Sequence, residues 1–236
     1  MVAVVDHRIP HQAQTNLTGL GYTLCKLPSH PALATPVSAH PDMLLFFAPD
    51  QIFCTKEYYQ IAKKELDSLS EHCKKRIDLI NDTQTNEYPH DILLNAAPVG
   101  KDLFCYADHT ASELTQHPAY RIQNVRQGYA KCSVIPIGDN ALITADPSIA
   151  KQAQAIGKEV LNIQSGHVHL DGYNTGFIGG CTSYSPYQSS KCIFFCGNFN
   201  HHPDASRISS FCYKHGYQPQ SLGEFSLYDI GTIFLL

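Results

Sequence analysis

Two histidines, a carboxylate and a cysteine fall within one short glycine-rich segment of this sequence. Residues 166–181 read GHVHLDGYNTGFIGGC. Residues two apart in an extended strand point to the same side of a sheet, so the side chains of His169 and Asp171 can face one ligand. An imidazole beside a carboxylate can act as a general acid or base near neutral pH. A metal site, an acid/base pair and a glycine-rich strand that other backbone approaches closely are therefore the three interpretations to weigh.

A metal site would use His167, His169 and Asp171, whose spacing places three ligands on one strand or turn. The metallo-β-lactamase pattern continues with a histidine directly after the aspartate, but Gly172 stands there. The segment HHPD at 201–204 could add ligands, although Asp204 is better placed to cap the helix that follows. We keep a metal-dependent hydrolase as the third alternative and expect no bound metal and no cofactor.

The nine cysteines are scattered and form no CxxC pair, which favours buried thiols in a reducing compartment over a disulfide framework. Cys132 follows Lys131, and a neighbouring ammonium can lower the pKa of a thiol. Strand alternation, however, turns Cys132 to the face opposite Lys131 and into the core. Cys181 follows two glycines, where the backbone can bend and expose it. Burial is the simpler interpretation of both thiols, and Cys132 is our candidate for a catalytic thiol.

The composition is that of a globular chain with one core. The chain has 236 residues, 43% hydrophobic and 16% charged. No run of about 18 apolar residues occurs, so we expect no membrane span. The N-terminal MVAVVDHRIP places an acid and a base where a signal peptide needs an apolar core, so we expect a cytoplasmic protein. A net charge of −4 without a basic stripe argues against a nucleic-acid partner, and the oligomeric state is left open.

A repeated pattern of elements accounts for the whole chain. Each repeat has an apolar strand, a short turn, a second apolar strand, a helix-like stretch and a third strand. Four copies are complete, at approximately 38–81, 87–126, 127–164 and 166–223. The C-terminal residues 225–236 supply a lone first strand, and residues 1–28 supply the other three elements. Joined, they make a fifth ββαβ unit, which predicts a single α/β domain over 1–236, closed by pairing of its termini.

Five ββαβ units closed across the termini resemble the five-bladed, pseudo-fivefold α/β propeller of the guanidino-group-modifying superfamily, the penteins. This superfamily includes arginine deiminases, dimethylarginine hydrolases, amidinotransferases and a ribosome anti-association factor. The segments QGYAKCS, GYNTGFIGG and DIG also resemble an uncharacterised clostridial family within it. The resemblance implies that the first strand of each unit lines a central channel.

The polar residues of these five first strands are therefore the candidates for contact with a small polar ligand. They are Asp42, Asp91, Gln127, Tyr129, Lys131, Asn174 and Asp229. In the deiminases, a His-x-Asp on the first strand of the fourth unit supplies an acid/base histidine and a carboxylate that orients it. The tripeptide HLD places His169 and Asp171 in the matching unit, so the resemblance implies catalytic roles for both.

The resemblance fails at the nucleophile. Enzymes of the superfamily attack the guanidino carbon with a cysteine on the first strand of the last unit, and the corresponding LYDIGTIFLL has none. Their third unit carries acids that bind the guanidinium, whereas QGYAKC offers Gln127, Tyr129 and Lys131, and Lys131 would repel a guanidinium. Two hypotheses follow: an amidino- or guanidino-type hydrolase or transferase with altered chemistry, and a non-catalytic protein that binds a small molecule or a partner.

Overall fold

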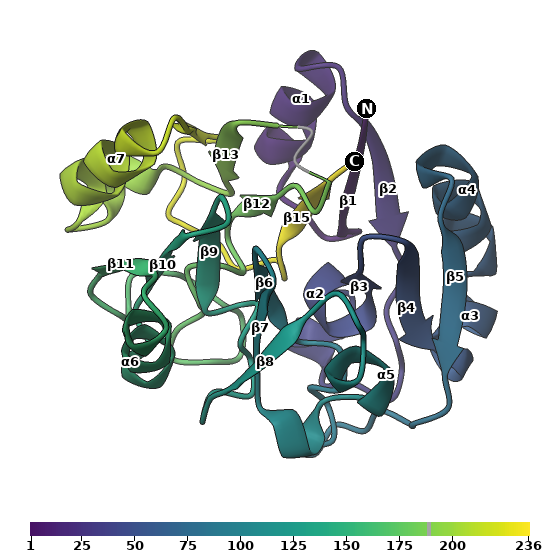
Figure 1. The fold of residues 1–236 in the computed structure, drawn as a ribbon. Coiled ribbons are helices and arrows are strands. Elements are labelled where there is room, and N and C mark those ends of the chain that lie inside the picture. Colours follow the sequence, from purple (N-terminus) through teal and green to yellow (C-terminus); the bar gives the residue numbers. More distant parts are fainter. Residues whose placement is uncertain (188–189) are drawn as a thin grey trace.

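The computed structural model describes residues 1–187 and 190–236 and shows an α/β fold of short strands and helices (Figure 1). Three sheets share one design, in which an antiparallel pair of strands is followed by a helical crossover to a third strand parallel to the second. Their strands are β3 (Phe46–Phe47), β4 (Gln51–Thr55), β5 (Arg76–Ile80), β6 (Ala97–Val99), β7 (Asp102–Cys105), β8 (Arg121–Asn124), β9 (Val134–Ile137), β10 (Ala141–Thr144) and β11 (Glu159–Asn162). The crossover helices are α3 (Lys56–Ile61), α4 (Lys63–Cys73), α5 (Ser112–Thr115) and α6 (Pro147–Ala155).

The remaining strands bring the two ends of the chain together. They form a four-stranded sheet in the order β12–β15–β1–β2 and a two-stranded sheet of β13 and β14. Their elements are β1 (Val2–Asp6), α1 (His11–Gly19), β2 (Thr23–Leu27), α2 (Pro41–Leu44), β12 (Ser183–Tyr184), β13 (Cys192–Phe195), α7 (Ala205–Lys214), β14 (Gln218–Ser221) and β15 (Ile233–Leu235). Strand β15 runs antiparallel to β1, with Val4 opposite Phe234. The expected pairing of the termini is confirmed.

Helices α1, α4, α6 and α7 lie around the outside of the molecule, whereas α2 and the first strands of the units lie nearer its middle (Figure 1). The core is therefore divided among the units rather than gathered under one sheet. Leu66 and Leu69 of α4, for example, share an apolar cluster with Ile52 and Cys54 of β4. Local sequence defines the helix ends as well: the carboxylate of Asp146 accepts hydrogen bonds from the first backbone N–H groups of α6 and so caps it.

Several segments that we predicted as first strands are turns or a helix. Residues 127–133 are loop and turn before β9, and residues 171–181 are mostly turn before β12. Asp42 lies in helix α2, because Pro41 occupies the first helical turn, where a fixed φ suits a helix. The apolar run that follows Pro41 misled the prediction, since a short apolar run does not distinguish a buried helical turn from a strand.

All nine cysteines are described by the structure, and all nine are free thiols. No helix in the described part of the chain has the length and apolar character needed to span a bilayer.

Candidate functional site

Polar side chains from four segments meet in a buried cluster, which we call the polar centre. Every member is at most 4% exposed. Its members are Asp42, Asn95, Lys131, Cys132, Asp229 and Thr232. The structure thus brings together four residues that the sequence singled out, which are Asp42, Lys131, Cys132 and Asp229.

A single hydroxyl group links the two principal charges of the polar centre. Lys131 Nζ donates to Thr232 Oγ1 at 3.1 Å, and this hydroxyl donates to Asp42 Oδ2 at 2.8 Å. Cys132 Sγ donates to the same carboxylate oxygen at 3.2 Å. The second oxygen of Asp42 is buried and has no hydrogen-bond partner among the described residues. The nearby ammonium therefore supplies the compensation that a buried carboxylate requires.

The ammonium of Lys131 points toward apolar surroundings. Its Nζ lies 5.2 Å from the ring centre of Tyr184 and 5.9 Å from that of Phe234. Burial lowers the pKa of Lys131, while the carboxylates of Asp42 and Asp229 act in the opposite direction. Burial also raises the pKa of Asp229, against the effect of His40, whose Nδ1 lies 3.8 Å from Asp229 Oδ1.

One expectation about this segment was wrong, whereas the burial that we preferred for the thiols of Cys132 and Cys181 is confirmed. Because residues 131–133 form a turn instead of a strand, Lys131 and Cys132 both reach the polar centre rather than opposite faces. The pKa of Cys132 is not lowered by Lys131 but raised well above its ordinary value, first by burial and then by the charge of Asp42. Burial likewise raises the pKa of Cys181. Both groups are therefore neutral thiols rather than thiolates.

Close backbone packing at two glycines permits this arrangement. A Cβ atom on Gly179 would lie 2.4 Å from the carbonyl oxygen of Val134, and one on Gly180 would lie 2.0 Å from Asp229 Oδ1. The interpretation of these glycines as points of close backbone approach is confirmed at Gly179, whereas at Gly180 it is a side chain that approaches. The carboxylate of Asp229 fits above Gly180 and accepts hydrogen bonds from the backbone N–H groups of Phe177 and Gly231.

His169 and Asp171 do pair, but at the surface rather than in a channel. His169 Nε2 lies 2.8 Å from Asp171 Oδ1, and the Tyr228 hydroxyl donates to Asp171 Oδ2 at 2.6 Å. The side chains of His169 and Asp171 are 58% and 72% exposed. The hydrogen bond from Tyr228, followed by that from His169, lowers the pKa of Asp171, and burial with the Asp171 charge raises the pKa of Tyr228 to about 12. The pair is thus a carboxylate that orients an accessible imidazole.

Asp91 and Tyr129 form a second pair. The Tyr129 hydroxyl donates to Asp91 Oδ2 at 2.6 Å, while Asp91 Oδ1 is buried without a partner among the described residues. The ring of Tyr129 lies 5.8 Å from that of Tyr88 and 5.9 Å from that of Phe177. Burial raises the pKa of Asp91. A carboxylate with a free oxygen beside aromatic rings is a setting that suits a small cation.

Of the other predicted residues, Gln127 contacts the second pair, since its Oε1 accepts a hydrogen bond from the Tyr129 N–H at 3.0 Å. Gln127 donates to the helix-capping carboxylate of Asp146, and Asn174 lies exposed in a turn. The ring of His167 contacts that of His202 at 5.2 Å, whereas His169 pairs with Asp171. Within residues 1–187 and 190–236, no three or more His, Cys, Asp or Glu side chains are grouped to hold a metal ion.

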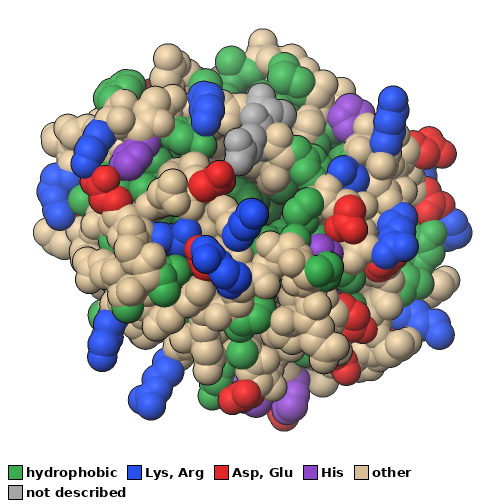
Figure 2. All heavy atoms as spheres, viewed as in Figure 1, with side chains coloured by type: hydrophobic (Ala, Val, Ile, Leu, Met, Phe, Trp, Pro, Cys, Tyr) green, Lys and Arg blue, Asp and Glu red, His purple; other side chains and the backbone are tan. Residues whose placement is uncertain are grey.

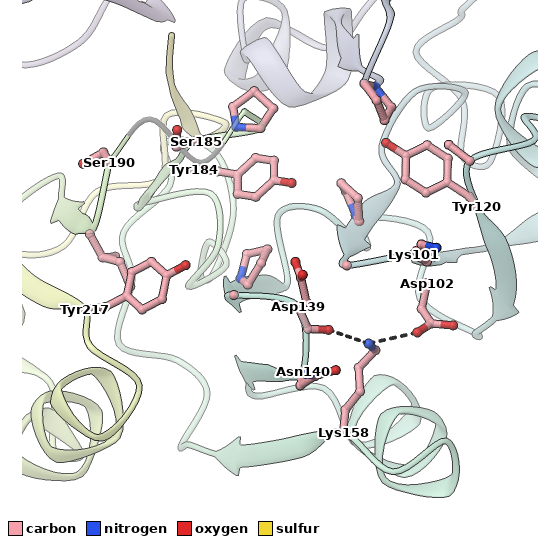
Figure 3. A pocket seen from close by; sticks show the side chains of 18 of the residues that line it. Lys101, Asp102, Tyr120, Asp139, Asn140, Lys158, Tyr184, Ser185, Ser190 and Tyr217 are labelled. Carbon is pink, nitrogen blue, oxygen red and sulfur yellow. Dashed lines mark hydrogen bonds and ion pairs between the residues drawn. The ribbon is translucent and has the colours of Figure 1, made fainter.

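Sequence reasoning missed a cavity of about 640 Å³. It lies at the end of the strands opposite to the polar centre, beside the turns that join the first and second strands, and we call it the hairpin-end pocket. Its wall includes Pro49, Gly100, Gly138 and Pro186, each from a turn or connection between the first and second strand of a unit. Figure 3 shows Lys158 between Asp102 and Asp139 on this wall. The signal in the sequence is the recurrence of glycine and charged residues after the first strands, in GKD and GDN.

The fold is that of guanidino-modifying enzymes. The structure of DDAH from Pseudomonas aeruginosa complexed with citrulline resembles it with a TM-score of 0.56, covering 93% of this chain and 91% of that one at 11% identity. A dimethylarginine dimethylaminohydrolase adduct with 4-chloro-2-hydroxymethylpyridine also has a TM-score of 0.56, over 92% of this chain and 90% of that one at 11% identity. Such low identity establishes the fold alone, and the resemblance to the pentein superfamily is confirmed at that level.

The chain belongs to the family of unknown function DUF6873, whose model matches residues 4–234. No curated protein matches the sequence.

Proposed function

We propose that this protein is a non-catalytic, ligand-binding pentein whose five units form the blades of an α/β propeller. The observation that carries this proposal is the buried ammonium of Lys131 in the polar centre, hydrogen-bonded through Thr232 to Asp42. A guanidinium would need unpaired carboxylates there. The chain's own cation already compensates Asp42, and burial raises the pKa of Asp229 and so favours its neutral form, which leaves little negative charge for an arginine-like substrate to neutralise.

The chemistry of the nearby side chains supports the same conclusion. The segment before β15 offers Asp229 and Thr232 but no thiol, and burial raises the pKa of both Cys132 and Cys181. A thiol attacks as its thiolate, so neither group is an activated nucleophile.

We assign ligand recognition to the surface formed by His169, Asp171, Asp91 and Tyr129. Asp229 connects the His169–Asp171 pair to the Asp91–Tyr129 pair. The backbone N–H of Asp229 donates to the carbonyl of His169. The Oδ2 atom of Asp229 accepts from the N–H of Phe177, and the ring of Phe177 contacts that of Tyr129. The exposed carboxylate of Asp171 and the aromatic rings favour a small polar cation, and the buried, unpartnered oxygen of Asp91 would accept from that cation once the neighbouring rings move aside.

One observation favours an enzyme instead. Thr232 has a φ of 68°, a left-handed conformation that a β-branched residue rarely adopts, and its hydroxyl contacts a lysine whose pKa is lowered. A lysine can activate a hydroxyl nucleophile in this way. Thr232 is 0% exposed, however, so this alternative requires the polar centre to open. Release of ammonia or methylamine from arginine, methylarginine or agmatine, lost in Thr232→Val, would establish it.

Thiol labelling of the native protein tests the absence of an activated cysteine. We expect Cys192, Cys25 and Cys73 to react with a disulfide reagent, because they are the partly exposed thiols. Cys25 should lag, since burial raises its pKa to about 11. Cys132 and Cys181 should react roughly a hundredfold more slowly, limited by local opening. Fast labelling of either, abolished in His169→Ala, would overturn the non-catalytic assignment.

Binding of agmatine tests the recognition surface. Calorimetric titration should show binding of agmatine, a guanidinium cation, and about tenfold weaker binding to Asp91→Asn, which keeps the acceptor for Tyr129 but removes the charge. N-carbamoylputrescine, in which a neutral urea replaces the guanidinium while the primary ammonium remains, should bind the wild type more weakly than agmatine does. Asp82→Asn, at an exposed carboxylate elsewhere, serves as the control. Equal binding of agmatine to the wild type and to Asp91→Asn would reject this surface.

A further inference from the structure

We infer that the hairpin-end pocket binds a small molecule in which an anionic group is attached to a planar ring. This second site goes beyond the recognition surface around His169, because it lies at the opposite end of the strands and shares none of its residues. A cavity of about 640 Å³ falls within the range of roughly 300–1,000 Å³ that is usual for pockets that enclose small molecules.

The charges of the pocket favour an anion. Its lining contains the cations Lys101, Arg121 and Lys158 but only two carboxylates, those of Asp102 and Asp139. Asp102 Oδ2 is shared, at 2.9 Å from both the Arg121 guanidinium and Lys158 Nζ. Lys101 makes no ion pair among the described residues, and its ammonium is therefore free for a ligand. Figure 2 shows Lys and Arg side chains gathered near the middle of this face of the molecule.

Two charged residues of the pocket wall, Lys158 and Asp102, are buried. The side chains of Lys158 and Asp102 are only 5% and 4% exposed. Lys158 Nζ also donates to the Asp139 carbonyl at 2.8 Å, which ties the start of β11 to the turn between β9 and β10. An ammonium fixed by two partners at a cavity wall keeps its position without a ligand, so little ordering is needed on binding.

The turns that frame the pocket are fixed against one another. Gly100 and Gly138 both have a φ of 61°, which glycine adopts without strain. A Cβ atom on Gly100 would lie 2.8 Å from the carbonyl oxygen of Asp139, so the two turns are in direct contact. The pocket is therefore formed before any ligand arrives.

Aromatic and proline side chains supply the flat part of the wall. Tyr120, Tyr184 and Tyr217 line the pocket together with five prolines. Figure 3 shows the rings of Tyr184 and Tyr217 on one side of the hollow and that of Tyr120 on the other. Rigid rings and proline faces pack well against a planar group. The hydroxyl of Tyr217 already accepts a hydrogen bond from Lys191 Nζ at 3.3 Å but can still donate one to a ligand. The lining thus combines a cationic end with a stacking surface.

Phenyl phosphate, benzylamine and inorganic phosphate are the probes that test this inference. Calorimetry at low ionic strength should show the tightest binding for phenyl phosphate, weaker binding for inorganic phosphate and none for benzylamine. Lys101→Gln should weaken the binding of phenyl phosphate about threefold, because a charged hydrogen bond is lost. Lys101→Glu should weaken it about tenfold or more, because repulsion then replaces that hydrogen bond. Lys64→Glu, the same charge change on an exposed face of α4, should leave binding unchanged.

Cys192 provides a second readout, since it lines the pocket and is partly exposed. Saturating phenyl phosphate should slow the labelling of Cys192 and leave that of Cys73 unaffected. The inference fails if phenyl phosphate does not bind at millimolar concentration, or if Lys101→Glu and Lys64→Glu affect binding equally. It also fails if benzylamine binds as tightly as phenyl phosphate. None of these outcomes depends on agmatine binding at Asp91, so the two sites can be judged separately.

Discussion

Lys131→Met is expected to destabilise the folded protein by about 3 kcal/mol at pH 7, because it leaves buried carboxylates without a compensating charge. Methionine has a similar length and no polar group, so the loss reports on charge rather than on volume. Urea unfolding followed by circular dichroism gives the free energy of unfolding. Lys64→Met, at an exposed lysine, should change this free energy by less than about 0.5 kcal/mol.

The pH dependence of this loss has a definite sign. Burial raises the pKa of Asp229 in the folded state, so its contribution to stability is fully present below the unfolded pKa and is lost as pH rises through the folded pKa. Without the ammonium of Lys131, that folded pKa rises further. The destabilisation by Lys131→Met should therefore shrink as the pH is lowered from 7 toward 5.

A second substitution separates charge compensation from packing. Asp42→Asn introduced together with Lys131→Met removes one of the uncompensated charges and should recover at least about 1 kcal/mol of the loss. Additive effects of the two substitutions, or a Lys131→Met variant as stable as the wild type, would show that Lys131 does not neutralise the polar centre. Either result would reject our interpretation that the ammonium of Lys131 compensates the carboxylates of the polar centre.

Gly179→Ala is expected to destabilise the protein by about 3 kcal/mol or more, measured in the same way. The added methyl group would lie 2.4 to 2.6 Å from the carbonyl oxygens of Val134, Lys131 and Cys132. These are backbone atoms of the turn that carries the polar centre, so they cannot move aside as a flexible side chain would.

Gly19→Ala is the matched control for this substitution. Gly19 is the last residue of α1, and a Cβ atom there would meet nothing within 4 Å. The variant should range from unchanged to about 1 kcal/mol more stable, because alanine favours a helix over glycine. If Gly179→Ala proved as benign as Gly19→Ala, the close packing of residues 179–180 against the turn before β9 would be disproved.

The two ends of the strands have different characters, which bears on function. At the end where the first strand of each unit begins, polar groups are either buried and hydrogen-bonded to one another, as around Lys131, or paired at the surface, as in His169 and Asp171. At the other end, the turns enclose an open cavity with a free lysine at position 101. A ligand can therefore reach the hairpin-end pocket without displacing any part of the polar centre.

The sequence by itself determined the repeat, the α/β class and the closure of the chain ends. These features follow from local patterns: strand and helix periods recur at regular intervals, and the leftover C-terminal strand matches the missing element of the N-terminal unit. The pairing of β15 with β1 requires no knowledge of side-chain contacts. The contact of His169 with Asp171 was also predictable, because two residues of separation keeps them close in a strand or a turn.

Only the tertiary structure decided the environment of each candidate residue. Strand alternation separated Lys131 from Cys132, but the glycine contacts at residues 179–180 hold their segment as a turn, and both side chains reach Asp42 through it. The adjacent lysine suggested an activated Cys132, whereas burial, which depends on the packing of several units at once, raises the pKa of the thiol. The hairpin-end pocket was invisible for the same reason, since its wall comes from turns far apart in the chain. Spacing along a sequence fixes neighbours within one segment, while desolvation and cavities depend on how distant segments meet.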